Sequence, residues 1–317
     1  MEKKVLENQT VVTEFILLAF GDIPAVQVLL FLMVLIIYII TMVGNILIVT
    51  LVMSDQHLHT PMYYFLGNLS CLETCYSSTI LPRMLASFVT GNRSISFNGC
   101  FLQMYFFGSL AATECFLLSA MSYDRYLAIC KPLHYTTLMS NRDCLCLMIG
   151  SWISGFLGNT ILFPLLQLTF CGANEIDHFF CDFNPLLKLA CSDTHKIIIV
   201  AFMIACIFTL PPFFLTVTSY ACIIATILRI PSSTGRKKAF STCSSHLIVV
   251  TIFYGTLMIV YMLPDTQLLG DLNKVFSAFY TVLTPMVNPL IYSLRNKEVK
   301  EALRKIQAKI IQARFLR

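Results

Sequence analysis

Charged residues are scarce in this chain of 317 residues: Asp, Glu, Lys and Arg make up 12% of it, against 57% hydrophobic residues and a mean hydropathy of +0.75. Soluble domains carry about 25% charged residues, so the composition excludes a water-soluble fold and predicts an integral membrane protein. The sequence also lacks the H-E-x-x-H and G-x-S-x-G motifs of hydrolases. We therefore expect no enzyme.

Long apolar runs are what the chain has instead. Seven runs recur, each long enough to cross about 30 Å of hydrocarbon as a helix. They cover roughly residues 25–53, 61–82, 98–128, 143–166, 197–228, 239–263 and 273–294. The sequence thus predicts an all-α membrane protein, a single seven-transmembrane helix bundle over residues 1–317 that ends in a short amphipathic C-terminal helix at 295–317.

The distribution of basic residues predicts the orientation of the chain. Fifteen of the 22 Lys and Arg residues lie on the C-terminal side of the membrane, in its loops and tail and at the end of the third span. The positive-inside rule places that side in the cytoplasm. Residues 1–24 are then extracellular, where Asn8 lies in a glycosylation sequon, and whether Asn92 is also glycosylated stays open. Because the basic residues are dispersed, we expect a multi-pass plasma-membrane protein that contacts lipid and not nucleic acid.

Glu73 and Glu114 are the only acids expected deep in the membrane. They lie about 12 and about 14 residues from the cytoplasmic ends of their helices, or about 18 and 21 Å at roughly 1.5 Å per residue, so they can face each other. Two ionised carboxylates are unfavourable side by side in hydrocarbon. This predicts either a bound Na⁺ between them, the only cofactor expected, or protonation of at least one. The alternative is two separate neutral acids, each hydrogen-bonded to nearby serines.

Of the 13 cysteines, only Cys100, Cys171, Cys181 and Cys191 are expected on the extracellular side. Four cysteines allow three connectivities, and the residues alone do not choose among them. Disulfides here would pin the long polar loop 167–196 as a lid over the outer mouth of the bundle.

An acid and an arginine stand side by side where the third apolar run ends, in M-S-Y-D-R-Y-L-A-I-C-K-P from Met121. An arginine at a helix end can simply extend to the headgroups. A second pattern, P-M-V-N-P-L-I-Y-S-L-R-N-K from Pro285, lies near the end of the last run. Together the two patterns resemble the rhodopsin-like G-protein-coupled receptors.

That resemblance implies a cytoplasmic switch, in which Arg125 exchanges a resting pair with Asp124 for a contact with a G protein. The sixth helix would close the cleft at rest. The residues assigned to this switch are Asp124, Arg125, Tyr126, Tyr220, His246, Asn288, Pro289 and Tyr292.

Further stretches are similar to one subfamily, the olfactory (odorant) receptors. They are P-M-Y-Y-F-L-G-N-L-S from Pro61, H-F-F-C-D from His178, K-A-F-S-T-C-S-S-H from Lys238 and F-Y-G from Phe253. The resemblance covers nearly the whole chain; Ser122 and Glu73 depart from it, where the family usually has alanine and aspartate. It implies a receptor that binds a small volatile odorant and activates a stimulatory, olfactory-type heterotrimeric G protein to raise cyclic AMP.

The same resemblance, with the position of Cys100 at the outer start of the third span, favours the disulfides Cys100–Cys181 and Cys171–Cys191. Pairing of Cys100 with Cys191 is the alternative.

An apolar ligand pocket is expected in the outer half of the bundle. Small residues on one face of the third span leave room, four residues of the sixth share a face at i, i+3, i+4 and i+7, and one hydroxyl on the seventh offers a hydrogen bond. Few polar groups suit a small hydrophobic ligand, although any of these residues can instead pack between helices. The predicted lining is Met104, Phe107, Gly108, Ala111, Ala112, Cys115, Tyr254, Leu257, Met258, Tyr261 and Thr281.

Two other functional classes, a transporter or channel and an intramembrane enzyme, fit the sequence less well. The odd number of spans and the lack of a half-to-half repeat disfavour a transporter or channel. A receptor of a different subfamily is the nearest alternative. Agonist-dependent cyclic AMP would separate a receptor from a transporter or an enzyme.

Overall fold

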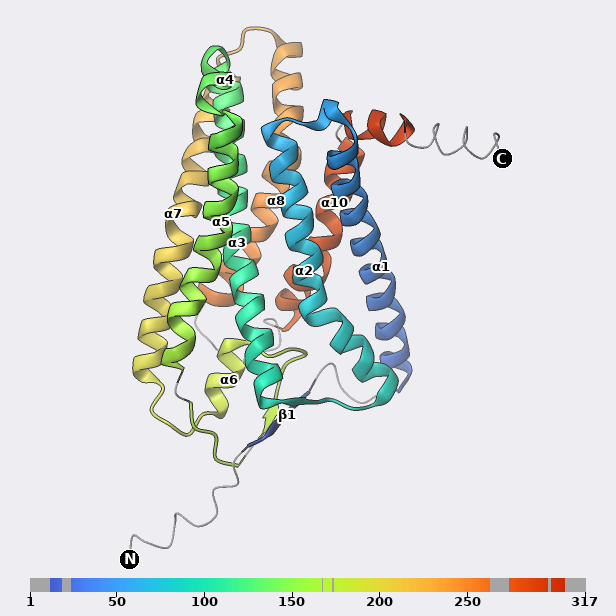
Figure 1. Ribbon diagram of the computed structural model, residues 1–317, viewed down its shortest axis with the longest axis vertical. Coiled ribbons are helices and arrows are strands. Elements are labelled where there is room, and N and C mark those ends of the chain that lie inside the picture. Colours follow the sequence, from blue (N-terminus) through green and yellow to red (C-terminus); the bar gives the residue numbers. More distant parts are fainter. Residues whose placement is uncertain are drawn as a thin grey trace, which may run out of the picture.

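The chain folds into long helices that run side by side, as seen in a computed structural model that describes residues 12–18, 24–166, 168–172, 174–262, 274–295 and 298–305 (Figure 1). Within these ranges the bundle consists of α1 (Pro24–Ser54), α2 (Pro61–Thr90), α3 (Phe97–Cys130), α5 (Asn141–Leu162), α7 (His195–Leu228), α8 (Ser233–Met262) and a last helix. The last helix is continuous through residues 274–278, the π-helical η5 (Phe279–Leu283) and α10 (Thr284–Arg295). The prediction of an all-α seven-helix membrane bundle is confirmed.

Short helices join or flank the long ones. They are η2 (Gln56–Leu58), η3 (Pro132–His134), α4 (Tyr135–Leu138), η4 (Phe163–Leu165) and α6 (Phe183–Leu189). A helical segment at 298–305 follows α10.

Two helices extend well beyond the predicted spans. α2 continues for about two turns past Pro82, which lies inside the helix, and ends where Gly91 adopts a left-handed φ of 69°. α8 begins at Ser233, so the polar stretch before the sixth apolar run is itself helical. A helix that projects out of the hydrocarbon needs no apolar residues in the projecting part. The apolar runs therefore underestimated the lengths of α2 and α8.

Among the described helices, five are long and apolar enough to cross a membrane by length and composition alone: α1, α3, α5, α7 and α8. The prediction counted seven. α2 falls short because it turns polar groups inward, including the buried Ser70, Glu73 and Ser77. The last helix likewise buries Thr284 and Asn288.

A small three-stranded sheet lies at one end of the bundle and was not predicted. Its strands are β1 (Glu14–Leu17), β2 (Ser94–Ser96) and β3 (Glu175–Ile176), in the order β2-β1-β3. β1 pairs antiparallel with β2 (Phe15 opposite Ile95) and parallel with β3 (Leu17 opposite Ile176). Strands this short carry no readable alternation, and their partners are far apart in sequence.

The two ends of the bundle differ in what caps them (Figure 1). The sheet and α6 lie at one end, here called the sheet end; α4 and the segment 298–305 lie at the other, here called the tail end. The segment 298–305 is amphipathic as predicted: Val299 and Ala302 are buried, whereas Lys300 and Arg304 are exposed. Tyr63 Oη donates a hydrogen bond of 2.6 Å to Glu298 Oε2 and so holds the segment to α2. Residues 306–317 of the predicted tail lie outside the described residues.

α3 is the central helix, in contact with α2, α5, α7 and α8. It crosses α5 so closely that a Cβ on Gly155 would overlap the backbone of Thr113. Only glycine allows this approach, which sets the position of α5 against the wall of α3.

Candidate functional site

A cavity of about 650 Å³ lies between α3, α5, α7, α8 and α6. All six α3 residues predicted for a pocket line it, and so do Leu257 and Tyr261 of α8. These α3 residues recur on one face because α3 is a continuous helix from Phe97 to Cys130. The cavity size falls within the range of small-molecule sites.

Three residues predicted for the pocket are not among its lining: Tyr254, Met258 and Thr281. Tyr254 is 3% exposed and donates a hydrogen bond of 3.0 Å to the carbonyl of Cys115, a lining residue. Thr281 is 0% exposed and donates to the carbonyl of Ser277 at 2.6 Å. Helical spacing identifies a shared face but not its depth, so it did not separate residues at the cavity from residues packed behind it.

Much of the lining comes from elements that sequence reasoning did not assign. α7 is apolar all round, so no face of it stands out, and α6 lies in a loop that was predicted only as a lid. The α5 lining contains a polar side chain, Asn159, among apolar ones. The additional residues include Gly158, Asn159 and Leu162 of α5, Ile198, Ala201, Phe202, Ala205 and Phe208 of α7, and Asp182, Phe183, Asn184, Leu187 and Lys188 at the lid.

A buried polar corner of the cavity lies at Asp182. Its Oδ1 accepts hydrogen bonds from Phe183 N (2.8 Å), which caps α6, and from Tyr261 Oη (3.2 Å) on α8. Tyr261 Oη also bonds Tyr280 Oη at 2.7 Å. Burial raises the pKa of Asp182 to about 6, although both hydrogen bonds favour the charged carboxylate. This corner ties the lid to two bundle helices.

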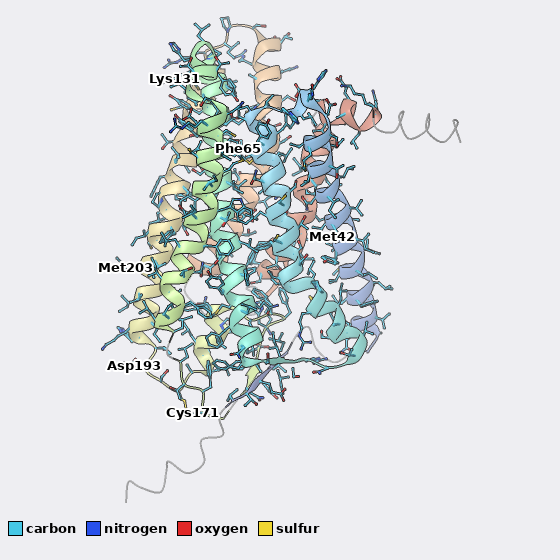
Figure 2. All side chains as sticks on the ribbon, viewed as in Figure 1. Met42, Phe65, Lys131, Cys171, Asp193 and Met203 are labelled. Atoms are coloured by element: carbon cyan, nitrogen blue, oxygen red, sulfur yellow. A yellow bond between two sulfur atoms is a disulfide. The ribbon has the colours of Figure 1, made fainter. Side chains whose placement is uncertain are left out.

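Two disulfides hold the lid, Cys100–Cys181 and Cys171–Cys191. This is the pairing that the resemblance favoured; the alternative partner for Cys100 is bonded elsewhere. Figure 2 places Cys171 at the sheet end together with Asp193, and Lys131 at the opposite end. Asn8, the predicted glycosylation site, lies outside the described residues.

Glu73 and Glu114 are both buried, at 1% and 3% exposure, and lie close enough to interact electrostatically. Asn288 Nδ2 donates a hydrogen bond to Glu73 Oε1. Within the described part of the chain, Glu73 Oε2 and Glu114 Oε1 have no hydrogen-bond partner, and neither has Ser77 Oγ one turn further along α2. Ser77 Oγ therefore does not supply the hydrogen bond that the alternative interpretation requires. Carboxylate oxygens without protein partners are what a cation or a proton would occupy.

At the tail end, Arg125 pairs with Asp124, as predicted for the resting switch. Arg125 Nε donates to Asp124 Oδ2 at 2.9 Å, and Asp124 is 0% exposed. Tyr135 of α4, which was not predicted, donates to Asp124 Oδ1 at 2.7 Å. The carboxylate is thus bonded on both oxygens, which compensates for its burial.

Tyr220 and His246 meet at the same end. Tyr220 Oη and His246 Nδ1 are 2.6 Å apart and join α7 to α8, and both side chains are buried. Electrostatic interactions with Arg125 place both near the guanidinium. Three residues from three helices therefore converge where the sequence predicted a cleft.

Two other residues assigned to the switch, Asn288 and Pro289, have partners away from Arg125. Asn288 belongs with Glu73 and not with Arg125. Pro289 faces α1, where a Cβ on Gly44 would come within 3.2 Å of its ring. The Tyr126 ring lies under the Lys131 ammonium at 6.0 Å. The side chain of Tyr292 lies outside the described residues. Helix register alone could not separate these neighbourhoods, because they depend on how the last helix is rotated.

Comparison with known proteins decides the family. A family model described as "Olfactory receptor" matches residues 34–309. The chain belongs to the olfactory receptor family. It is 50% identical over 302 residues to Olfactory receptor 6B1 of Homo sapiens, covering 95% of this chain and 96% of the relative. Olfactory receptor 5B21 of Mus musculus is 50% identical over 311 residues, 98% of each chain.

Membership in the olfactory receptor family establishes the general function. The chain is an odorant receptor and a G-protein-coupled receptor, a multi-pass protein of the plasma membrane. As a member of this family it is a receptor and not an enzyme. The cavity at the sheet end and the Arg125 cluster at the tail end are the two candidate sites of such a receptor.

Proposed function

We propose that this olfactory receptor binds a small, mainly hydrophobic volatile molecule in the cavity, and that it activates a stimulatory, olfactory-type heterotrimeric G protein to raise cyclic AMP. The observation that carries the proposal is the lining of the cavity. It is formed largely by apolar and small side chains, and its polar groups include Asp182, the amides of Asn159 and Asn184, and Lys188. Such a site binds chiefly by burying apolar surface and orients its ligand with one or two hydrogen bonds.

The proposed orientation places the sheet end outside the cell and the tail end in the cytoplasm. Both disulfides lie at the sheet end, and disulfides persist in oxidising surroundings. Basic residues lie near the helix ends at the tail end, where the positive-inside rule favours them if that end is cytoplasmic. They are Lys131, Arg229, Arg236 and the basic residues of 298–305. Basic residues there also suit contact with anionic lipid.

Tyr254 provides the proposed link between ligand and G protein. It lies on α8 and donates its hydrogen bond to Cys115, so a ligand that displaces the Cys115 turn of α3 also changes how α8 is held. His246 lies about two turns further toward the tail end of α8 and bonds Tyr220. A ligand with higher affinity for one arrangement of α8 would shift the population toward it.

Glu73 and Glu114 form the proposed cation or proton site, coupled to activation. The oxygens without partners support it, since Na⁺ or a proton would satisfy them. Asn288 bonds Glu73 from the last helix, so movement of that helix would alter the site.

A ligand panel read out by cyclic AMP in a heterologous cell tests the proposal. We expect at least one neutral, apolar odorant to raise cyclic AMP in cells that express the chain and not in mock-transfected cells. Arg125→Lys, at matched surface expression, should abolish the response because lysine keeps the charge but loses the planar fork. A full response from Arg125→Lys would reduce Arg125 to a membrane anchor, and a response confined to another second messenger would refute stimulatory coupling.

A further inference from the structure

The cavity reaches the outer surface of the bundle along α7. Ile198 and Phe202 line it, yet they are 47% and 58% exposed, and the lining residue Ala205 is exposed as well. Side chains that both line the cavity and are exposed form the thin part of its wall, where the cavity reaches the surface of the bundle. These residues lie at i, i+4 and i+7, on one edge of α7. Ala205 is about 15 Å along the helix from its start at His195, in the uncharged stretch that follows Lys196.

The opposite edge of this opening is formed by α5. The opening ends on its tail-end side at Gly158, where α5 and α7 touch: a Cβ on Gly158 would come within 3.0 Å of the Phe208 ring. From that contact toward the sheet end, Leu162 of α5 and Phe202 of α7 line the two sides. The opening therefore faces lipid and is bordered by apolar side chains.

Beside the sheet, the sheet end is closed by a packed apolar cluster that adjoins the cavity. Phe15 of β1 and Ile176 of β3 are 0% exposed, and they pack with Phe170 and Leu186. Met104 belongs both to this cluster and to the cavity lining. The Cys100–Cys181 disulfide fixes the lid to α3. Opening this end would separate paired strands and buried aromatic rings, which is costly.

A second, polar rim of the cavity lies at α6, where Asn184 and Lys188 are exposed lining residues. The concentration of an apolar molecule is higher in the lipid at the apolar rim than in the water at the polar rim. Each methylene group favours the bilayer over water by about 0.8 kcal/mol, so a hydrophobic odorant accumulates in the lipid. The apolar rim is the one that faces this reservoir.

We propose that ligands reach the cavity from the lipid, through the side opening between α5 and α7 at Ile198, Phe202 and Ala205. These residues thereby select neutral molecules that partition into membranes. The inference rests on the proposed function, that this cavity holds a small hydrophobic ligand. The kinetics distinguish a residue in the passage from one that only contacts the bound ligand. Narrowing the passage slows association and dissociation alike and leaves the Kd unchanged, whereas loss of a contact changes the Kd.

The test uses the full-length receptor in phospholipid nanodiscs and the neutral fluorophore N-phenyl-1-naphthylamine. Trp152 is the only tryptophan of the chain and lies on α5, so saturable energy transfer from it reports binding above the lipid background. The narrowing variant is Ala205→Phe. Met203→Phe is the matched control, because Met203 is 54% exposed on the same helix but is not a lining residue (Figure 2). Asn184→Phe narrows the polar rim.

We expect Ala205→Phe to lower both rate constants by about tenfold with the Kd within about twofold of wild type, because both directions cross the same barrier. Phe202→Ala should raise both rate constants. Met203→Phe should leave both unchanged, and Asn184→Phe should slow association much less than Ala205→Phe does.

Slowing by Asn184→Phe with no effect of Ala205→Phe would overturn the proposal in favour of an aqueous route. A changed Kd with an unchanged association rate in Ala205→Phe would make Ala205 a contact residue only. Absence of saturable transfer in the wild type would show that the cavity does not take up molecules from the bilayer. Because the assay contains no G protein, loss of odorant-driven cyclic AMP would refute the proposed function without affecting this result.

Discussion

Tyr220 Oη and His246 Nδ1 lie 2.6 Å apart and join α7 to α8 at the end of the bundle where Arg125 pairs with Asp124. Removing the hydroxyl leaves a buried imidazole nitrogen without its partner, which costs about 1–3 kcal/mol. We expect Tyr220→Phe to lower the melting temperature of the purified receptor. The double variant Tyr220→Phe/His246→Phe should lose less stability than the sum of the losses in the two single variants. Tyr38→Phe, a half-exposed tyrosine of α1, is the control. Additive losses would show that the two side chains do not depend on each other.

Filling the cavity from α3 should weaken the odorant response. Ala112 lines the cavity, and a phenylalanine there would occupy the space of the ligand. We expect Ala112→Phe to weaken agonist potency at least about tenfold, or about 1.4 kcal/mol, at unchanged surface expression. Leu102→Phe on the outer face of α3 is the control, since Leu102 is 56% exposed. Gly108 is a less selective test, because a Cβ there would come within 2.9 Å of Asn159 Oδ1. Equal potency for Ala112→Phe would remove this α3 face from the site.

Neutralising Glu114 should uncouple signalling from sodium. Glu114→Gln removes the charge that would hold a cation beside Glu73 but preserves the side-chain shape. We expect altered basal cyclic AMP and a response that no longer varies between sodium and choline media. Glu301→Gln makes the same charge change on the exposed face of 298–305. If wild-type signalling is itself indifferent to sodium and to both neutralisations, the two acids are structural.

The crossing of α3 and α5 should tolerate no side chain at Gly155. A Cβ there overlaps the backbone of Thr113, so Gly155→Leu should prevent folding and leave the receptor inside the cell. Gly150 lies on the same helix with open space around it, and Gly150→Leu should be expressed as well as the wild type. Surface staining of the two variants compares them directly. Similar surface levels would show that the helices can separate at this crossing.

Stability should depend on pH through Asp182. Its pKa is raised from 3.8 to about 6 in the folded receptor by burial, so the folded state binds a proton more tightly than the unfolded chain does. The stabilisation is complete below pH 4 and is lost as the pH rises through 6, by on the order of 1–3 kcal/mol. We expect a higher melting temperature at pH 5 than at pH 7, and a smaller difference in Asp182→Asn. An equal difference in that variant would assign the pH dependence to other groups.

Much of the fold was readable because hydrocarbon imposes simple rules on a sequence. A helix must supply about 20 apolar residues to cross it, and α1, α3, α5 and α7 begin and end near the predicted residues. The buried depth of Glu73 and Glu114 followed from the rise per residue, and so did the α3 face of the cavity, since one helix places residues three and four apart on one side. The family motifs gave the pair of Asp124 with Arg125.

Only the tertiary structure decided what depends on neighbours distant in sequence. β1 is a strand because Phe15 pairs with Ile95 and Leu17 pairs with Ile176 at the sheet end, and nothing within Glu14–Leu17 requires this. Asn288 bonds Glu73 and Tyr254 bonds Cys115 because of how the last helix and α8 are rotated, which helical periodicity leaves free. α7 is apolar on every side, so the sequence determined that it lies in the membrane. Which of its edges opens the cavity to lipid was set by the close approach of Gly158 and Phe208.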